Sequence, residues 1–155
     1  MISTSLREEI SIELELMAKI VYEVLSLRHD VTGRAATVRE RTAAASFLAQ
    51  FYGGVENILK RIQRYYKTPL PVGDTWHLDL FNRFCPPGYK MLPLLFDNNL
   101  AFKLPPFRKF RHVVHHGYGF QIEWEMISDG LDNLEAVFRD VSVSLESFLE
   151  SLPKS

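Results

Sequence analysis

Apolar residues recur every three or four positions along most of this chain, which is the spacing of an amphipathic helix. The first run begins near Ser3 or Thr4 and ends at a polar cluster that includes Asp30 and Gly33. It predicts a helix of roughly six turns. Its apolar face is formed by Ile10, Leu14, Met17, Val21, Val24 and Leu25.

A second run predicts a long helix over residues 36–66, whose apolar stripe holds Phe47, Phe51, Val55, Ile58, Ile62 and Tyr65. Gly53 and Gly54 interrupt its middle, and each costs about 1 kcal/mol of helix stability relative to alanine. We therefore expect the pair to permit the close approach of another helix, or to kink this one.

The last run has the most regular spacing in the chain, with apolar residues alternating at four and three positions over residues 127–152. This is the pattern of a bundle helix with one apolar seam, and Pro153 is expected to close it. The seam consists of Ile127, Leu131, Leu134, Phe138, Val141, Leu145, Phe148 and Leu152.

Shorter elements are predicted in between. Asp74 is a suitable N-cap for a short helix over residues 75–84, and a proline-rich loop follows. A fourth helix carries residues 107–118, and Pro105-Pro106 either starts it or kinks an earlier turn. No segment alternates with period two for long enough to indicate a strand. The predicted fold is all-α, an antiparallel bundle of four to five helices.

Composition narrows the class of protein. The 155 residues are the length of one domain, so we expect a single helical domain over residues 1–155. The one cysteine, Cys85, cannot form an intramolecular disulfide, which favours the reducing cytoplasm. The acidic N-terminal segment does not resemble a signal peptide, and no apolar run is long enough to span a membrane. The expected location is therefore the cytoplasm, away from membranes.

Charge is distributed unevenly although the net charge is only −1. Residues 34–67 hold seven Lys or Arg against two acids, residues 98–122 hold four against none, and residues 123–155 hold two against eight. Basic segments that meet in the fold can attract phosphates despite an acidic total, while charge alone fits solvated helix faces equally well.

Residues 107–118 are the stretch richest in chemical groups, with three of the five histidines and three Lys or Arg side chains. On an ideal helix its residues are ordered outward from the core as follows: Phe107, Phe110 and Val114; then Arg111 and Tyr118; then Arg108 and His115; and finally His112 and His116. Histidine can act as acid or base near neutral pH, and arginine is a fixed planar cation. These are the groups that metal-independent cleavage of an RNA phosphodiester requires. One copy presents them on diverging faces, whereas two copies across a dyad can assemble them in one cleft.

The order Arg111-His112, three residues, His116-Gly117-Tyr118 resembles the R-x4-H-x-Y signature of HEPN-domain ribonuclease toxins of the HepT-like branch. The helical layout, residues 51–58, residues 74–77 and the long last helix also resemble that family. Arg108 and His115 satisfy a looser form of the motif, and His115 is the better helical neighbour of Arg111. We prefer Arg111 and His116 because only this pair keeps the Gly-Tyr spacing.

The resemblance implies a metal-independent, cofactor-free endoribonuclease that is the toxin of a toxin–antitoxin pair. It implies that Arg111 and His116 are catalytic, that the motifs of two protomers form a composite site in a homodimer, and that RNA, with tRNA a leading candidate, is the substrate. His112, His115 and Arg108 would be auxiliary. Tyr118 would be AMPylated by a cognate nucleotidyltransferase of the minimal MNT type, which silences the toxin by adding bulk and negative charge.

Other readings remain open from the sequence. The chain could be a non-catalytic helical subunit, or a nucleotide-binding subunit, that partners a nucleotidyltransferase. A metal site is not expected, because adjacent His115 and His116 cannot easily reach one ion and no nearby carboxylate or thiolate completes a ligand set. His77 is expected to be a packing or capping residue beside Trp76, and Cys85 has no nearby base to activate it.

Overall fold

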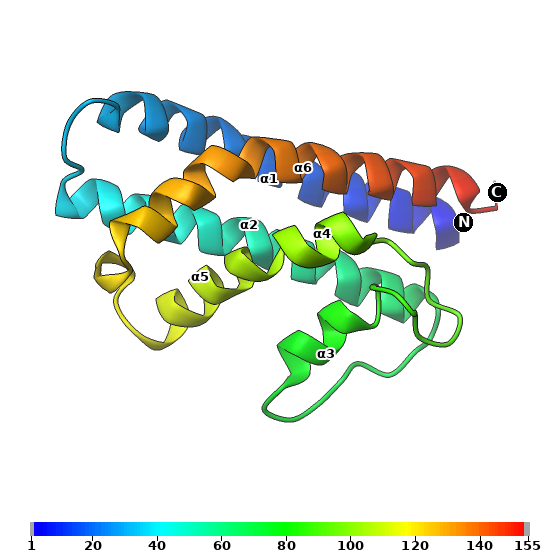
Figure 1. The fold of residues 1–155 in the computed structure, drawn as a ribbon. Coiled ribbons are helices and arrows are strands. Elements are labelled where there is room, and N and C mark those ends of the chain that lie inside the picture. The colour runs from blue at the N-terminus through cyan, green and yellow to red at the C-terminus, as the bar shows by residue number, and fades with distance from the viewer. Residues whose placement is uncertain (1, 154–155) are drawn as a thin grey trace.

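The computed structural model describes residues 2–153, which are folded into six α-helices and one short 3-10 helix and contain no strand (Figure 1). The predicted all-α bundle is therefore confirmed. Within these residues no helix combines the length and apolar character needed to cross a bilayer. The elements are α1 Ile2–Val31, α2 Val38–Tyr65, α3 Trp76–Asn82, α4 Asn98–Lys103, α5 Pro105–His116, η1 Gly119–Gln121 and α6 Trp124–Ser151.

Three long helices form the body of the bundle. α1 and α2 run antiparallel and pack along much of their length, and α6 lies antiparallel to α1 (Figure 1). α5 packs against α2, and short α3 contacts α2 further along. The predicted apolar seams of α2 and α6 are buried or half-buried in this core, so the hydrophobic pattern located these helices correctly.

α2 packs against α1, α3, α5, η1 and α6. Its start is fixed by a capping box, in which the Thr37 side chain accepts from the backbone of Glu40 and the Glu40 carboxylate accepts from the backbone of Thr37. Besides the predicted apolar stripe, α2 buries a second row of side chains, which is partly polar. It is formed by Tyr52, Glu56, Leu59 and Gln63. Because two of these four residues are polar, the hydrophobic pattern gave no sign of the second row.

The glycine pair of α2 permits close packing, which confirms one of the two expectations for it, and the helix continues through it. A Cβ atom on Gly54 would lie 2.7 Å from Cγ of Met17 in α1. A Cβ atom on Gly53 would lie 3.1 Å from Nη1 of Arg111 in α5. Both neighbouring helices thus approach bare backbone.

Around α3 and α5, the N-cap of α3 and the additional helix α4 differ from the prediction, whereas the start of α5 at Pro105-Pro106 is one of the two alternatives left open. Thr75, not Asp74, is the N-cap residue of α3, and no side chain caps this helix end; the Thr75 hydroxyl donates instead to the Asp79 carboxylate. A separate short helix, α4, precedes Pro105, so the two prolines start α5 at positions that need no backbone donor. α5 ends at His116, with Gly117 as its C-cap.

Candidate active site

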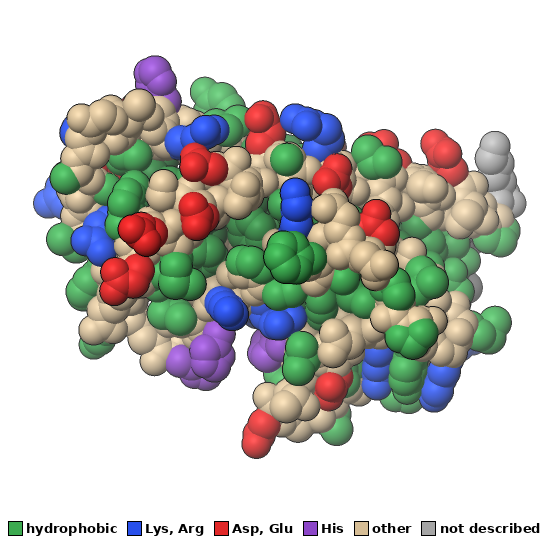
Figure 2. All heavy atoms as spheres, in the orientation of Figure 1, with side chains coloured by type: hydrophobic (Ala, Val, Ile, Leu, Met, Phe, Trp, Pro, Cys, Tyr) green, Lys and Arg blue, Asp and Glu red, His purple; other side chains and the backbone are tan. Residues whose placement is uncertain are grey.

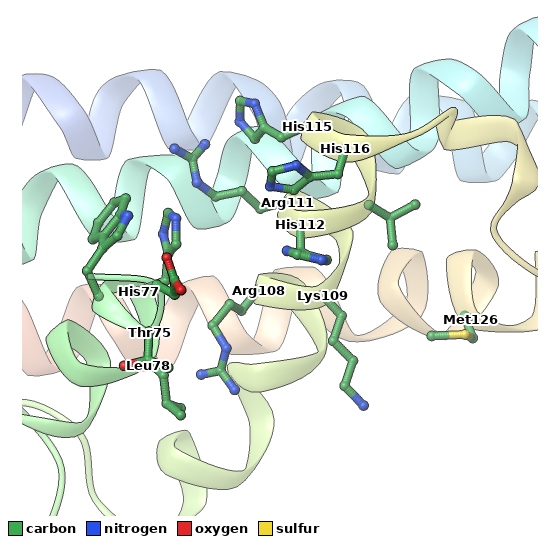
Figure 3. A pocket seen from close by; sticks show the side chains of 13 residues that line it. Thr75, His77, Leu78, Arg108, Lys109, Arg111, His112, His115, His116 and Met126 are labelled. Atoms are coloured by element: carbon green, nitrogen blue, oxygen red, sulfur yellow. The ribbon is translucent and has the colours of Figure 1, made fainter. Parts of the chain in front are cut away.

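A pocket of about 760 Å³ lies between α3 and the exposed side of α5 (Figure 3). Four of the five histidines line it, together with three Lys or Arg side chains. Figure 2 shows His side chains at a notch on this edge of the molecule, with Lys or Arg side chains directly above them. The basic and imidazole groups of the lining are His77, Arg108, Lys109, Arg111, His112, His115 and His116.

α5 carries all of these groups except His77, and it presents them to the pocket because its opposite face is anchored in the core. Phe107 and Phe110 are buried, and the ring of Phe107 packs edge-on against Phe51 of α2 with centroids 5.3 Å apart. His112 and His116 are exposed one turn apart, with ring centroids 4.6 Å from each other. The predicted arrangement of an anchored face and an outward imidazole face is therefore present.

Arg111 is held by a buried carboxylate of α2. Its Nε atom lies 2.6 Å from Oε1 of Glu56, an ion pair in which the Glu56 side chain is 1% exposed and that of Arg111 25% exposed. Gly53 leaves the space in which the guanidinium crosses α2. Since a buried carboxylate without a partner is costly, Glu56 fixes the arginine at the pocket wall.

The same carboxylate contacts a histidine from α3. Oε2 of Glu56 lies 2.6 Å from Nδ1 of His77, and the ring of His77 reaches the pocket. Glu56 thus joins a residue from α3 to one from α5. We name this set, Glu56, His77 and Arg111, the Glu56 bridge.

Sequence reasoning missed Glu56 and took His77 for a packing or capping residue. One signal was available: a lone carboxylate beside two glycines in the middle of a buried helix. It could not be linked to His77 or Arg111, because these residues are 21 and 55 positions away in the chain.

Arg108 belongs to the same wall of the pocket. Its guanidinium lies over the ring of Phe81, 5.5 Å from the centroid. Burial raises the pKa of the neighbouring Tyr52 hydroxyl, with Glu56 acting in the same direction, while the positive charge of Arg108 acts against it. Tyr52 is therefore neutral at physiological pH and is not a proton acceptor.

Cys85 is not equipped for nucleophilic chemistry. It is buried, and burial raises the pKa of its thiol to about 11. The thiol donates to the backbone carbonyl of Phe81. Because the thiolate is the nucleophilic form, this cysteine stays inert near neutral pH.

Tyr118 lies outside the pocket lining. The helical projection was wrong for this residue, because α5 ends two residues earlier and Tyr118 has an extended backbone before η1. Its ring is 64% exposed and stacks on Phe120, with centroids 5.7 Å apart. The hydroxyphenyl group is therefore accessible from solvent beside the end of α5.

Among residues 2–153, no three His, Cys, Asp or Glu side chains come together as a metal site would require. The absence of a metal from the reaction remains a prediction from the sequence.

A protein-family model described as "HepT-like protein" matches residues 43–152, which include most of α2 and the whole of α3, α4, α5 and α6. No curated protein and no solved structure matches the chain.

Proposed function

This chain belongs to the HepT-like family of HEPN-type proteins, and on that basis we propose that it is a metal-independent endoribonuclease acting as a toxin. The observation that carries the proposal is the pocket between α3 and α5, in which four histidines and two arginines face one space. The lining is cationic and can attract the phosphates of RNA.

RNA cleavage without a metal requires a base for the 2′-hydroxyl, an acid for the leaving 5′-oxygen and fixed positive charge for the phosphorane. In the proposed mechanism Arg111 stabilises the phosphorane, because its guanidinium is permanently charged and is held in place by Glu56. His116 transfers a proton. It lies in the last turn of α5 and lines the pocket.

Arg108, His112 and His115 take auxiliary roles in this proposal. Each lines the pocket and can contact a phosphate of the bound strand. His115 is also the alternative partner of Arg111 on α5, one turn further along the helix.

We further propose that two copies pair across the exposed side of α5, so that both motifs face one RNA strand. The surface that flanks α5 supports this, since it exposes large apolar side chains that a monomer would leave in water. Phe102 is 81% exposed, Tyr118 64%, Met126 45% and Phe120 42%. Pairing there would cover these side chains and bring two sets of histidines together.

The test of the proposed activity is RNA cleavage by the purified chain in excess chelator. The wild-type chain should cut total cellular RNA, including tRNA, at full rate in chelator, and its expression should arrest bacterial growth. His116→Ala should lose both effects, while His29→Ala, which changes an exposed histidine that does not line the pocket, should retain both. Cleavage that requires added metal would refute the proposal. Binding of RNA without cutting, together with normal growth, would favour a non-catalytic interaction subunit.

Tyr118 is the proposed site of silencing by a cognate nucleotidyltransferase of the MNT type. An exposed tyrosine beside the end of α5 is open to a modifying enzyme. Each AMP adds a bulky phosphodiester with a negative charge close to the cationic surface. That charge opposes the attraction on which binding of the RNA backbone depends.

Co-expression with the nucleotidyltransferase should add one or more AMP groups to the peptide that contains Tyr118, as measured by mass spectrometry. Tyr118→Phe should remain unmodified, because it lacks the accepting hydroxyl. Tyr22→Phe is the matched control, since Tyr22 is 71% exposed on α1 and should not affect modification. A silenced chain without added mass would refute this role.

A further inference from the structure

We propose that His77 is the general base of the reaction, with Glu56 as its positioning residue and His116 as the general acid. This inference rests on the ribonuclease function proposed above. It assigns a catalytic role to α3, an element that carries none of the R-x4-H-x-Y residues.

Glu56 orients the imidazole ring of His77. Nδ1 of His77 lies 2.6 Å from Oε2 of the buried Glu56 carboxylate, which accepts a hydrogen bond from the Nδ1–H group. This contact fixes the tautomer, with hydrogen on Nδ1 and the lone pair on Nε2. Nε2 is then the nitrogen available to a ligand in the pocket, which the residue lines.

The imidazole ring of His77 is also accessible. The His77 side chain is 36% exposed, so it is partly open to solvent although its partner carboxylate is enclosed. The adjoining ring of Trp76 lies against it, with centroids 3.4 Å apart, and Lys60 of α2 covers Trp76 at 4.5 Å. A ring that is supported on one side and open on the other is suited to accept a proton from a bound ligand.

Glu56 also balances the positive charge that His77 acquires in the reaction. Removal of a proton from the substrate makes His77 an imidazolium, and the Glu56 carboxylate stabilises that cation, as a carboxylate does behind the histidine of other hydrolases. Arg111 shares the carboxylate from α5, Lys60 approaches from α2, and Asp74 and Asp79 flank His77 from its own segment. Arg108 and the three α5 histidines face the same pocket.

The resulting reaction is balanced. Nε2 of His77 takes the proton of the 2′-hydroxyl, and the 2′-oxygen forms a bond to phosphorus. Arg111 stabilises the charge on the phosphorane. The bond from phosphorus to the 5′-oxygen then breaks, and the imidazolium of His116 gives its proton to that oxygen. The products are a 2′,3′-cyclic phosphate and a 5′-hydroxyl, with the proton transferred from His116 to His77 overall.

The proposed base and the proposed acid come from different elements of the chain. His77 is carried by α3 and His116 by α5, and both line the pocket between these helices (Figure 3). The two proton transfers occur on opposite sides of phosphorus in an in-line displacement, so a base and an acid on facing walls fit the path of the reaction.

The test uses an RNA cut by the wild-type chain, resynthesised with sulfur in place of the bridging 5′-oxygen at the mapped cleavage site. A thiolate leaves without protonation, so this substrate no longer needs the acid but still needs the base. His77→Asn is the informative variant, because the asparagine amide can donate to Glu56 as Nδ1 does but offers no basic nitrogen. His77→Gln is the second variant, and circular dichroism with a thermal melt checks that both fold.

His77→Asn should cut the normal RNA about 10²- to 10⁴-fold more slowly than wild type and should remain slow on the sulfur substrate. His116→Ala should be slow on the normal RNA and recover most of its rate on the sulfur substrate. His29→Ala should match wild type on both.

Wild-type rates for both folded His77 variants would overturn the inference and leave the ribonuclease proposal standing. Rescue of His77→Asn by sulfur would make His77 the acid and also overturn the assignment. Failure of the wild-type chain to cut any RNA would instead refute the proposed function itself.

Discussion

Replacing Arg111 with alanine should slow RNA cleavage by about a thousandfold and restore growth to cells that express the chain. The guanidinium is the only Lys or Arg group among residues 2–153 whose charge is held at the pocket by the buried Glu56 carboxylate. A donor fixed in this way stabilises the phosphorane without having to reorganise during the reaction. Single-turnover rates on a mapped RNA, with excess chelator present, measure the loss.

Two further variants serve as comparisons for Arg111→Ala. Arg111→Lys keeps the charge but loses the planar fork, so we expect a rate between those of wild type and Arg111→Ala. Arg139→Ala removes an exposed arginine of α6 that does not line the pocket, and it should cut RNA normally. Equal rates for Arg111→Ala and wild type would remove Arg111 from the mechanism.

The largest effect on stability is expected for Glu56→Ala. This change leaves two groups, Arg111 and His77, without their shared carboxylate and opens space on the second buried row of α2. Breaking a buried ion pair on one side costs about 3–5 kcal/mol; because Arg111 and His77 are partly solvated, we expect about 2–3 kcal/mol here. In a chain of this length that lowers Tm by about 5–10 °C.

Glu56→Gln separates charge from volume. The amide keeps the shape of the side chain and one acceptor, so its loss of stability should be smaller than that of Glu56→Ala. Cleavage should still fall, because neither Arg111 nor an imidazolium at His77 is then balanced by negative charge. Glu135→Ala changes an exposed side chain of α6, so it is the surface control and should have the melting temperature of the wild type. A wild-type melting temperature for Glu56→Ala would contradict the role of the Glu56 bridge.

The sequence determined the long helices well and the connections between them poorly. α2 and α6 each carry an apolar stripe of many turns, so a few irregular positions do not obscure the pattern. α3 and α4 have seven and six residues, too few for periodicity to define their ends. Local capping chemistry therefore decided the prediction there, and Asp74 resembled an N-cap although the helix starts one residue later.

The α5 wall of the candidate site was also predictable, because its groups are close together in sequence and share one helix. The contribution of α3 and the buried carboxylate behind the pocket were not predictable. Glu56 sits among buried residues of α2, and His77 follows a tryptophan that suggests packing, so neither residue stands out locally. Only the packing of α3 and α5 on α2 joins them to Arg111.

The glycine pair of α2 has a consequence for how this protein can change. Gly53 and Gly54 are adjacent in sequence but serve different neighbours, Arg111 in α5 and Met17 in α1. At these two residues only the main chain of α2 lies between Arg111 at the candidate site and Met17 in the core. A side chain added at position 53 would press on the arginine of the candidate site, whereas one added at position 54 would press on the packing of the bundle, so neighbouring codons expose two different properties of the protein to mutation.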